Sequence, residues 1–430
     1  MSKDLFRPLK NLTTKIGSGA TPRGGQANYK KEGISLIRSQ NVLDMSFSKD
    51  GLAYIDEEQA KKLINVEVFS NDILLNITGD SIARVCKVPN EVLPARVNQH
   101  VSILRSNHLL DPDYLLYYLI YKKDYLLTIS RVGGTRNALT KEAIENLEIR
   151  VDKNQQKIAS VLSALDDKIE LNNKINAELE AMAKTMYDYW FVQFDFSFDF
   201  AQDKPNAEGK PYKSSGGKMV FNETLKREIP EGWEVKTIGD YCKSTGGFAF
   251  KSSWWSDKGL AVVKIKDIQE DNTISLNDLS YADIPSDKIG VNFLAKPGNV
   301  LIAMTGATVG KFAIVPYTNE QLFVNQRVGY FNLGENPMDK LPFLINSLNQ
   351  KYFREAIFTL ASGAAQPNIS NEQINNIALL LPKKELILKF NSSLSSYYSK
   401  ILNNQKENQE LASLRDWLLP MLMNGQVSVE

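Results

Sequence analysis

Cysteine and histidine are scarce in this chain of 430 residues, which has two of each. Cys86 and Cys242 lie far apart and in no CxxC spacing, and the histidines are His100 and His108. These few residues exclude a disulfide framework and a zinc cluster. No nucleophilic triad, carboxylate metal cluster or nuclease-type site can be assembled from the remaining residues either, so we expect a protein without catalytic activity.

Long apolar runs are also absent. No run approaches the roughly 18 apolar residues that a membrane helix needs, and the first residues, MSKDLF, contain no apolar signal core. We therefore expect a cytoplasmic protein. No two prolines are adjacent, which excludes an Asn-Pro-Pro-Tyr methyltransferase motif, and a net charge of +1 argues neither for nor against nucleic acid.

The sequence contains an internal repeat. Five segments of the first half recur in the second half in the same order, at offsets that grow from 226 to 232 residues. VNQHV at 97–101 returns as VNQRV at 324–328, and NDILLNITGDSIARVCKVP at 71–89 matches GNVLIAMTGATVGKFAIVP at 298–316. Two unrelated domains of similar composition would not repeat VNQ-x-V in register, so the sequence indicates a duplication.

Each copy divides into a domain and a long helix. β-rich apolar runs alternate with Gly, Pro and Asn breakers and end in a short helical stretch (114–127 and 341–358), which predicts a mixed α/β domain. We predict domains at 1–152 and 231–382, long helices at 153–192 and 383–424, a connector at 193–230 and a tail at 425–430. The fold class is therefore α+β.

The two predicted long helices carry apolar residues at alternating steps of four and three, which is a heptad seam. Both seams are interrupted by asparagines, at Asn172 and Asn176 and at Asn404 and Asn408. A buried asparagine costs stability but specifies register. We predict that the helices pair as an antiparallel coiled coil with pseudo-twofold symmetry. The alternative is that each helix packs on its own domain with the asparagines in solvent.

The connector has its own texture. Phenylalanine and aspartate alternate through 194–200, which favours a short packed strand over a binding strip, and AQDKPNAEGKPYKSSGGK at 201–218 is typical of a flexible segment.

Taken together, these features resemble the specificity (S) subunits of type I restriction–modification systems. The resemblance covers nearly the whole chain and depends on the duplicated layout, TGATVGK at 305–311, the NQ motif, GAAQPNIS at 363–370 and the connector from WFVQFDF to IPEGWEV. The first copy departs from it, with GTRNAL at 134–139 and RPLKNL at its start. In that family each domain is a target recognition domain that reads one half of a split DNA site, and the helices act as spacers and dock methyltransferase subunits.

The resemblance implies a non-catalytic, sequence-specific DNA-binding subunit that reads a bipartite, asymmetric site. Its partners would be double-stranded DNA, two methyltransferase (M) subunits and restriction (R) subunits. It would need no cofactor, since S-adenosylmethionine and ATP would be bound by the partner subunits. The main alternative is a coiled-coil scaffold that holds protein partners and does not read DNA, although such a scaffold would not need two large β-rich domains.

A nucleotide-dependent enzyme is a third reading, suggested by TGATVGK. A Walker A motif needs four residues between its glycines and Ser or Thr after its lysine, whereas three residues separate Gly306 from Gly310 and Phe312 follows Lys311. A tight turn after a strand explains the motif better.

Polar positions that change between the copies are the candidates for reading DNA, because they vary on a repeated framework. Arg38, Gln40 and Asn41 become Lys264, Lys266 and Asp267; Arg84 becomes Lys311; His100 becomes Arg327; Arg136 becomes Gln366; and Ala138 becomes Asn368. The full set predicted to contact DNA is Arg23, Lys30, Arg38, Gln40, Asn41, Arg84, Arg136, Lys251, Lys264, Lys266, Lys311, Arg327, Gln366 and Asn368. For each, solvated surface is the alternative, and for Trp254 and Trp255 the alternatives are DNA stacking and core packing.

Overall fold

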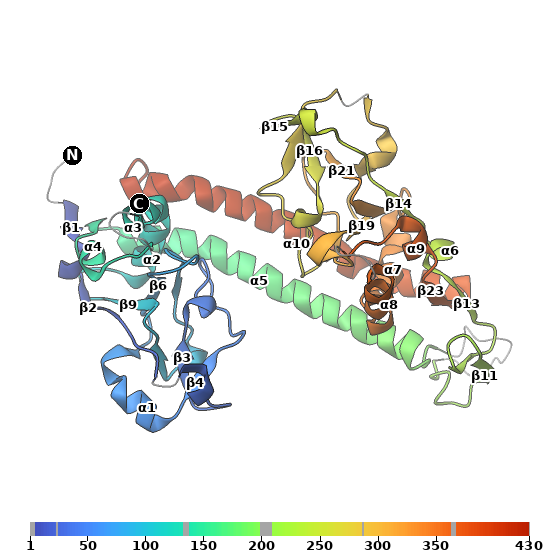
Figure 1. The fold of residues 1–430 in the computed structure, drawn as a ribbon, viewed down its shortest axis with the longest axis horizontal. Coiled ribbons are helices and arrows are strands. Elements are labelled where there is room, and N and C mark those ends of the chain that lie inside the picture. Colours follow the sequence, from blue (N-terminus) through green and yellow to red (C-terminus); the bar gives the residue numbers. More distant parts are fainter. Residues whose placement is uncertain are drawn as a thin grey trace. The chain divides into compact units, whose positions relative to one another are not determined.

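The computed structural model describes residues 5–22, 25–131, 137–197, 209–285, 288–362 and 367–429. They form two compact units, one of residues 1–169 with 410–430 and the other of residues 170–409. Each unit contains one mixed α/β domain and part of both long helices (Figure 1). The sequence also predicts where each domain, helix and connector begins and ends. These boundaries stay predictions.

The first domain is built on two four-stranded sheets. One sheet has the order β2 (Thr13–Ser18), β9 (Val101–Ser106), β6 (Ile73–Asn76) and β7 (Val85–Lys87), and the other has the order β4 (Ala53–Ile55), β3 (Ile34–Ile37), β8 (Ala95–Val97) and β5 (Glu67–Val68). β1 (Phe6–Pro8) pairs with β10 (Glu148–Arg150). The helices are α1 (Glu57–Lys62), α2 (Pro112–Tyr121), α3 (Lys123–Ser130) and α4 (Lys141–Glu145).

The second domain repeats this plan. Its sheets have the orders β14 (Ser244–Gly246), β22 (Val328–Phe331), β19 (Val300–Ala303), β20 (Phe312–Ile314) and β15 (Trp255–Ser256), β17 (Ser280–Ala282), β16 (Leu260–Val263), β21 (Leu322–Val324), β18 (Leu294–Ala295). β13 (Glu234–Thr237) pairs with β23 (Ala378–Leu381). The helices are α6 (Ile238–Tyr241), α7 (Leu341–Leu348), α8 (Lys351–Ala361) and α9 (Asn371–Asn375).

Strand pairing confirms the duplication. β3 runs parallel to β8 in the first domain, and β16 runs parallel to β21 in the second. Ile37 pairs with Val97 and Val263 with Val324, so the same positions of the repeat face each other. The small terminal helices also start alike, because Thr140 and Ser370 each accept a hydrogen bond from the third residue of the helix.

The short helical stretch predicted in each domain is in fact two helices. α2 ends and α3 begins at Lys122, and α7 and α8 are separated by Asn349 and Gln350. Gln350 has extended backbone angles (φ −68°, ψ 145°), which no α-helix can include, so the chain must turn there. Apolar periodicity alone does not register such a break.

The long helices are α5 (Gln155–Tyr187) and α10 (Lys384–Asn424), and a single π-helical turn, Asp188–Val192, extends α5. In both units α5 and α10 lie side by side and run antiparallel (Figure 1). In the first unit, Arg415 of α10 binds Asp166 of α5 at 2.6 Å. Arg415 occupies a seam position where the heptad pattern wants an apolar residue, and the ion pair fills it.

In the second unit, the asparagines meet between the two helices. The Nδ2 atom of Asn172 donates to Asn408 Oδ1 (2.9 Å) and to Glu407 Oε2 (2.8 Å), while Asn404 Nδ2 donates to Asn176 Oδ1 (2.8 Å). Asn172 and Asn404 are fully buried. The predicted antiparallel pairing is therefore confirmed, and the role of these amides in fixing the register stays a proposal.

Each long helix ends inside a domain core. Tyr187 and Phe191, at the end of α5, pack with Phe343 and Phe390 in the core of the second domain. Leu419, Leu422 and Met423, at the end of α10, join the first domain's core, which also contains Ile158 and Leu162 of α5.

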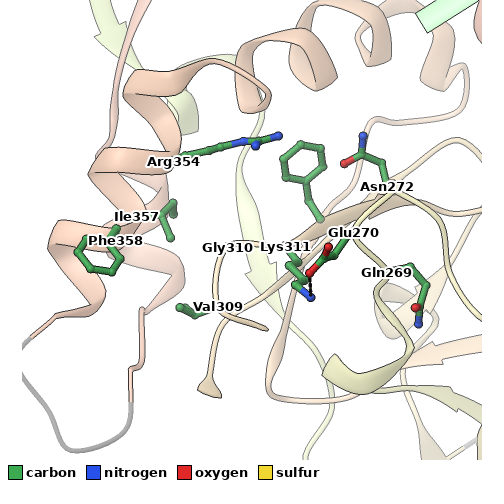
Figure 2. Close-up of a pocket in the computed structure, with 10 residues that line it drawn as sticks. Gln269, Glu270, Asn272, Val309, Gly310, Lys311, Arg354, Ile357 and Phe358 are labelled. Carbon is green, nitrogen blue, oxygen red and sulfur yellow. Dashed lines mark hydrogen bonds and ion pairs between the residues drawn. The ribbon is translucent and has the colours of Figure 1, made fainter. Parts of the chain in front are cut away.

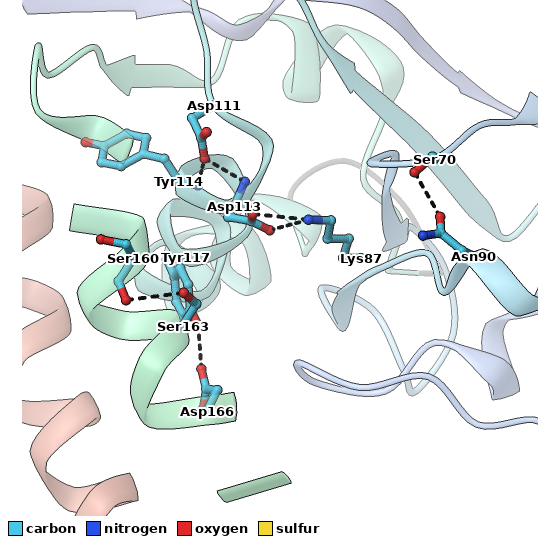
Figure 3. A network of polar contacts seen from close by, with 10 residues as sticks. All are labelled: Ser70, Lys87, Asn90, Asp111, Asp113, Tyr114, Tyr117, Ser160, Ser163 and Asp166. Atoms are coloured by element: carbon cyan, nitrogen blue, oxygen red, sulfur yellow. Dashed lines mark hydrogen bonds and ion pairs between the residues drawn. The ribbon is translucent and has the colours of Figure 1, made fainter. Parts of the chain in front are cut away.

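Polar contacts fasten the start of α5 to the first domain. The hydroxyl of Tyr117 in α2 donates to Asp166 Oδ2 of α5 at 2.6 Å (Figure 3). Asp111 caps the same α2 helix, and Asp113 in its first turn binds Lys87 of β7 at 2.8 Å. Asp166 therefore binds both α2 and, through Arg415, α10.

Aromatic residues of the connector are buried. Phe194 and Phe196 are buried, as a packed strand requires, their carbonyls accept from Lys213 N (3.2 Å) and Tyr212 N (2.9 Å), and Ser197 forms a bridge with Pro211. Tyr212 is buried as well and stacks on Phe196 with ring centroids 4.7 Å apart. A hairpin of β11 (Met219–Asn222) and β12 (Arg227–Pro230) follows. Tyr212 is thus a packed residue within a mostly exposed stretch, and the flexibility of the segment stays a prediction; residues 201–208 lie outside the described part.

A cavity of about 460 Å³ lies between part of α5 and the second domain. Glu180 and Lys184 of α5 line it together with Arg354 of α8 and Tyr398 of α10. Burial, reinforced by the nearby charge of Asp271, raises the pKa of Glu180 to about 7.

Replacing Asn172, Asn176, Asn404 and Asn408 together with leucine should raise the melting temperature, because four polar groups leave the helix interface, and should loosen the register. Thermal unfolding monitored by circular dichroism measures the first effect, and engineered disulfides in shifted registers measure the second. The matched control is Asn403→Leu, at an exposed position of α10. Unchanged melting and unchanged register would count against a specifying amide layer.

Glu180→Gln should stabilise the protein at pH 8 and have little effect at pH 5. The folded protein holds the Glu180 proton more tightly than the unfolded chain does, so the free energy of unfolding falls as pH rises from about 4.5 to 7, and the neutral amide removes that loss. We expect a gain on the order of 1–3 kcal/mol at pH 8, measured by denaturant unfolding at both pH values. Glu178→Gln, at an exposed position of the same helix, is the control; an equal gain at both pH values would contradict the expectation.

Candidate nucleic-acid interface

A large cleft lies on the first domain where four loops meet. Its volume is about 1080 Å³, and three of the polar positions compared between the copies, Gln40, Arg84 and His100, line it. The other lining residues are Ser39, Thr78, Gly79, Asp80, Ser81, Ile82, Leu127, Ser130, Arg131, Asn137 and Ala138. Residues separated by up to a hundred positions in the sequence therefore converge here, and most of them carry hydrogen-bonding groups.

The VNQ motif shapes one wall of this cleft. The side chain of Asn98 accepts a hydrogen bond from the backbone N–H of His100 (3.0 Å), which closes the turn between β8 and β9. Asn325 makes the same bond to Arg327 in the second domain (3.1 Å). The motif thus recurs because its asparagine builds a turn, and the turn presents the residue two positions later, His100 or Arg327.

His100 is held on both sides of its ring. Its Nδ1 lies 2.5 Å from Thr78 Oγ1, and its Nε2 lies 3.1 Å from Gln99 Nε2. Both ring nitrogens therefore have a hydrogen-bonding partner. The imidazole is therefore oriented at the cleft wall before any ligand arrives.

A short 3-10 turn follows the first parallel strand in each domain, Ser39–Asn41 and Ile265–Asp267. The residue before it bonds to the turn's last side chain: Arg38 N donates to Asn41 Oδ1 (3.0 Å), and Lys264 N donates to Asp267 Oδ2 (2.8 Å). Both capping residues are buried. Burial also raises the pKa of the Asp267 carboxyl.

Asn41 therefore belongs to the framework. It is fully buried, and its Nδ2 also donates to the carbonyls of Ser48 (3.0 Å) and Asp50 (3.2 Å). With its amide committed to the loop, Asn41 has no free surface with which to contact DNA. Comparing the copies cannot reveal this, because a residue can change between copies while keeping an internal role.

The cations at the start of the two turns rest on aromatic rings. The Arg38 guanidinium lies 5.4 Å from the Tyr29 ring centroid and donates to Gly51 O (2.5 Å), and Lys264 Nζ lies 3.3 Å from the Trp255 ring centroid. Burial and the neighbouring charge of Lys266 lower the pKa of Lys264. Tyr29 and Trp255 lie at matching positions of the repeat. The sequence analysis did not identify them as a matched pair of rings beneath these cations.

In the second domain, the turn after β19 brings Thr305 beside Asn368. Lys311 lines a groove of about 400 Å³ next to this turn and pairs with Glu270 at 3.0 Å (Figure 2). Glu270, at 85% side-chain exposure, and Arg354 of α8 on the opposite wall were missed by the sequence analysis, because neither lies in a repeated motif.

The remaining predicted residues are dispersed. Lys30 pairs with Asp56 (3.4 Å), Lys251 lies 5.2 Å from the Trp254 ring centroid, and Lys266 donates to the carbonyl of Asp278 (2.6 Å). Arg327 and Asn368 are exposed. Arg23, Arg136 and Gln366 lie outside the described residues. Trp254 and Trp255 are partly buried against an aromatic cluster with Phe248 and Phe250, so packing accounts for much of their surface.

Comparisons with known proteins agree with this architecture. A sequence profile of the family described as "Type I restriction modification DNA specificity domain" matches residues 6–181 and 230–413. The chain is 28% identical over 450 residues to the type I restriction enzyme HindI specificity subunit of Haemophilus influenzae, covering 92% of this chain and 94% of the relative. It is 27% identical over 435 residues to the MjaIX specificity subunit of Methanocaldococcus jannaschii, covering 96% and 91%.

Among solved structures, the S subunit of a type I restriction–modification system from M. genitalium resembles the chain with a TM-score of 0.56. The match covers 100% of this chain and 98% of that one at 16% identity, so it concerns the fold alone. Among the described helices, none has the length and apolar character to cross a membrane.

Asn41→Ala should lower the free energy of unfolding by about 1–3 kcal/mol, because it leaves the N–H of Arg38 and two loop carbonyls without partners. Gln40→Ala, one residue earlier and exposed, should change it by less than about 0.5 kcal/mol. Denaturant unfolding of the two variants provides the comparison. Equal losses would contradict the division between framework and surface.

Proposed function

Because the chain belongs to the family of type I restriction–modification specificity subunits, we propose that it reads a bipartite, asymmetric DNA sequence and places two methyltransferase subunits on it. Family membership itself implies a non-catalytic subunit that recognises a DNA target within a complex of methyltransferase and restriction subunits. The proposal adds how the two domains divide the reading.

The observation that carries the proposal is a repeated backbone that presents different side chains. The same turn offers Gln40 in one domain and Lys266 in the other, and the same VNQ turn offers His100 and Arg327. Amide, imidazole and cationic groups prefer different base edges and phosphates. Two such domains would recognise different half-sites, so the whole target would be asymmetric.

The proposed interface of the first domain is the cleft, with Gln40, Arg84 and His100 on its walls, together with Arg38 at the start of the turn that carries Gln40 and, away from the cleft lining, Lys30. The second domain would contribute Lys251, Lys264, Lys266, Lys311, Arg327 and Asn368. Arg23, Arg136 and Gln366 belong to the proposal from the sequence alone. Arginine and lysine would supply phosphate contacts that hold the duplex, and the amides would supply base contacts.

The division of labour with the partners is proposed from membership of the family. The chain binds and orients the duplex, and the methyltransferase subunits hold S-adenosylmethionine and receive the target base, which has to leave the base stack to be modified. ATP belongs with the restriction subunits. The paired helices α5 and α10 would set the separation between the two readers and therefore the gap between the half-sites.

The test is to express the full chain with its methyltransferase subunits in a host without methylation and to map the methylated positions. We expect one asymmetric target of two short sequences separated by a gap of fixed length. Methylation without sequence preference, or at a target that persists when this chain is omitted, would reject the function.

Lengthening both helices by one heptad, between Lys168 and Ile169 and between Glu410 and Leu411, should widen the gap without changing either half-site. Seven residues add about 10 Å of helix, which corresponds to about three base pairs. The control exchanges seven existing residues of α5 for a heptad of the same apolar pattern, which should leave the gap unchanged. An unaltered gap in the lengthened protein would reject the spacer role of the helices.

A further inference from the structure

We propose that the exposed residue of the short 3-10 turn, Gln40 in the first domain and Lys266 in the second, selects one base of each half-site, adenine through Gln40 and guanine through Lys266. The inference rests on the proposed function and adds to it which side chain discriminates and between which bases.

The two turns are the same piece of backbone. Each follows the strand that runs parallel to its neighbour, and the residue before the turn has nearly the same backbone angles, φ −120° and ψ 166° at Arg38 against φ −112° and ψ 171° at Lys264. The residue after it also agrees, φ −94° and ψ 107° at Val42 against φ −84° and ψ 113° at Ile268. A base presented to either turn would meet the same geometry and a different side chain.

Burial along the turn singles out one position. In both copies the first three positions, starting with the cation, are half-buried, half-buried and exposed, and the next two are buried. The exposed one is Gln40 or Lys266. Asn41 and Asp267 are committed to the backbone bonds of Arg38 and Lys264, so they cannot serve as readers without dismantling the turn.

The cation before the turn has a supporting role. Arg38 and Lys264 keep a positive charge in both copies, and in both copies that charge rests on the ring at the matching position, Tyr29 or Trp255. A group that stays cationic while the half-site changes fits a phosphate contact, which carries no sequence information. The aromatic ring restricts that cation and so fixes the turn beside it.

The side chains of Gln40 and Lys266 also donate hydrogen bonds to backbone carbonyls of their own domain. Gln40 Nε2 lies 3.3 Å from the carbonyls of Asp50 and Gly51, and Lys266 Nζ lies 2.6 Å from the carbonyl of Asp278. Gly51 (φ +61°) makes this possible in the first domain, because a Cβ atom there would lie 2.5 Å from Gln40 Nε2. Both side chains are thus directed by the loop that follows the turn.

The chemistry of the two side chains then determines the base. A glutamine amide matches adenine in the major groove, accepting from N6 and donating to N7, whereas a lysine ammonium donates to the O6 and N7 acceptors of guanine. Gln40 also lines the cleft that holds Thr78, Arg84 and His100, where a base edge would be enclosed by other polar groups.

The test exchanges the two side chains in the full chain, assembled with its methyltransferase subunits. Gln40→Lys should change one base of the first half-site from adenine to guanine and leave the second half-site alone, and Lys266→Gln should do the reverse in the second half-site. Methylated sites are mapped across a genome, and binding is measured on duplexes that differ at that base. We expect a change in preference of about tenfold or more.

Three further variants keep the outcome interpretable. Gln40→Ala should relax the base preference at that position without lowering the melting temperature, Arg38→Lys should keep the preference, and Lys62→Gln, at an exposed position of α1, should change nothing. An unchanged target in both exchanged variants would overturn the inference, and so would an equal loss of binding to all sequences, which marks a phosphate contact. The unaltered protein is measured separately. If it directs no sequence-specific methylation, the proposed function itself fails, whatever the variants do.

Discussion

The amide layer between α5 and α10 is the constraint on which the second unit's geometry depends. Asn172 is buried, so its Nδ2 must find acceptors, and Asn408 and Glu407 supply them in the observed register. A slip of one turn along the seam would leave those groups buried without partners, at a cost of about 1–3 kcal/mol each. Each helix also ends in a domain core, α5 in the second domain and α10 in the first.

The duplication and its consequences were predictable from sequence, because order and spacing survive when residues change. The two copies of VNQ-x-V indicated the duplication, and the structure shows that Asn98 and Asn325 form the same turn in both domains. The heptad spacing gave the antiparallel pair, and four interrupting asparagines marked the place where the helices bond. Helix packing and domain duplication both leave regular spacings of residues, so they can be recognised in the sequence alone.

The candidate interface was only partly predictable. Gln40 and Asn41 look equally polar in the sequence, yet one is exposed and the other is fully buried, because the turn directs adjacent side chains to opposite environments. Tyr29 and Trp255 look like core residues until Arg38 and Lys264 are seen above their rings. The folded loops decide which polar side chains are already engaged in contacts within the domain. The spacing of residues in the sequence does not encode this.

The end of the chain has an evolutionary consequence. Leu422 and Met423 complete the core of the first domain, and the guanidinium of Arg150 reaches the carbonyl of Leu422 across 272 positions of sequence. A recombination event that replaced the first domain would therefore have to suit Leu422 and Met423, which are encoded far downstream of it. Exchange of first domains between lineages should succeed where the crossover preserves this contact surface. The codons that tolerate the most substitution should be those of the loops that contact DNA.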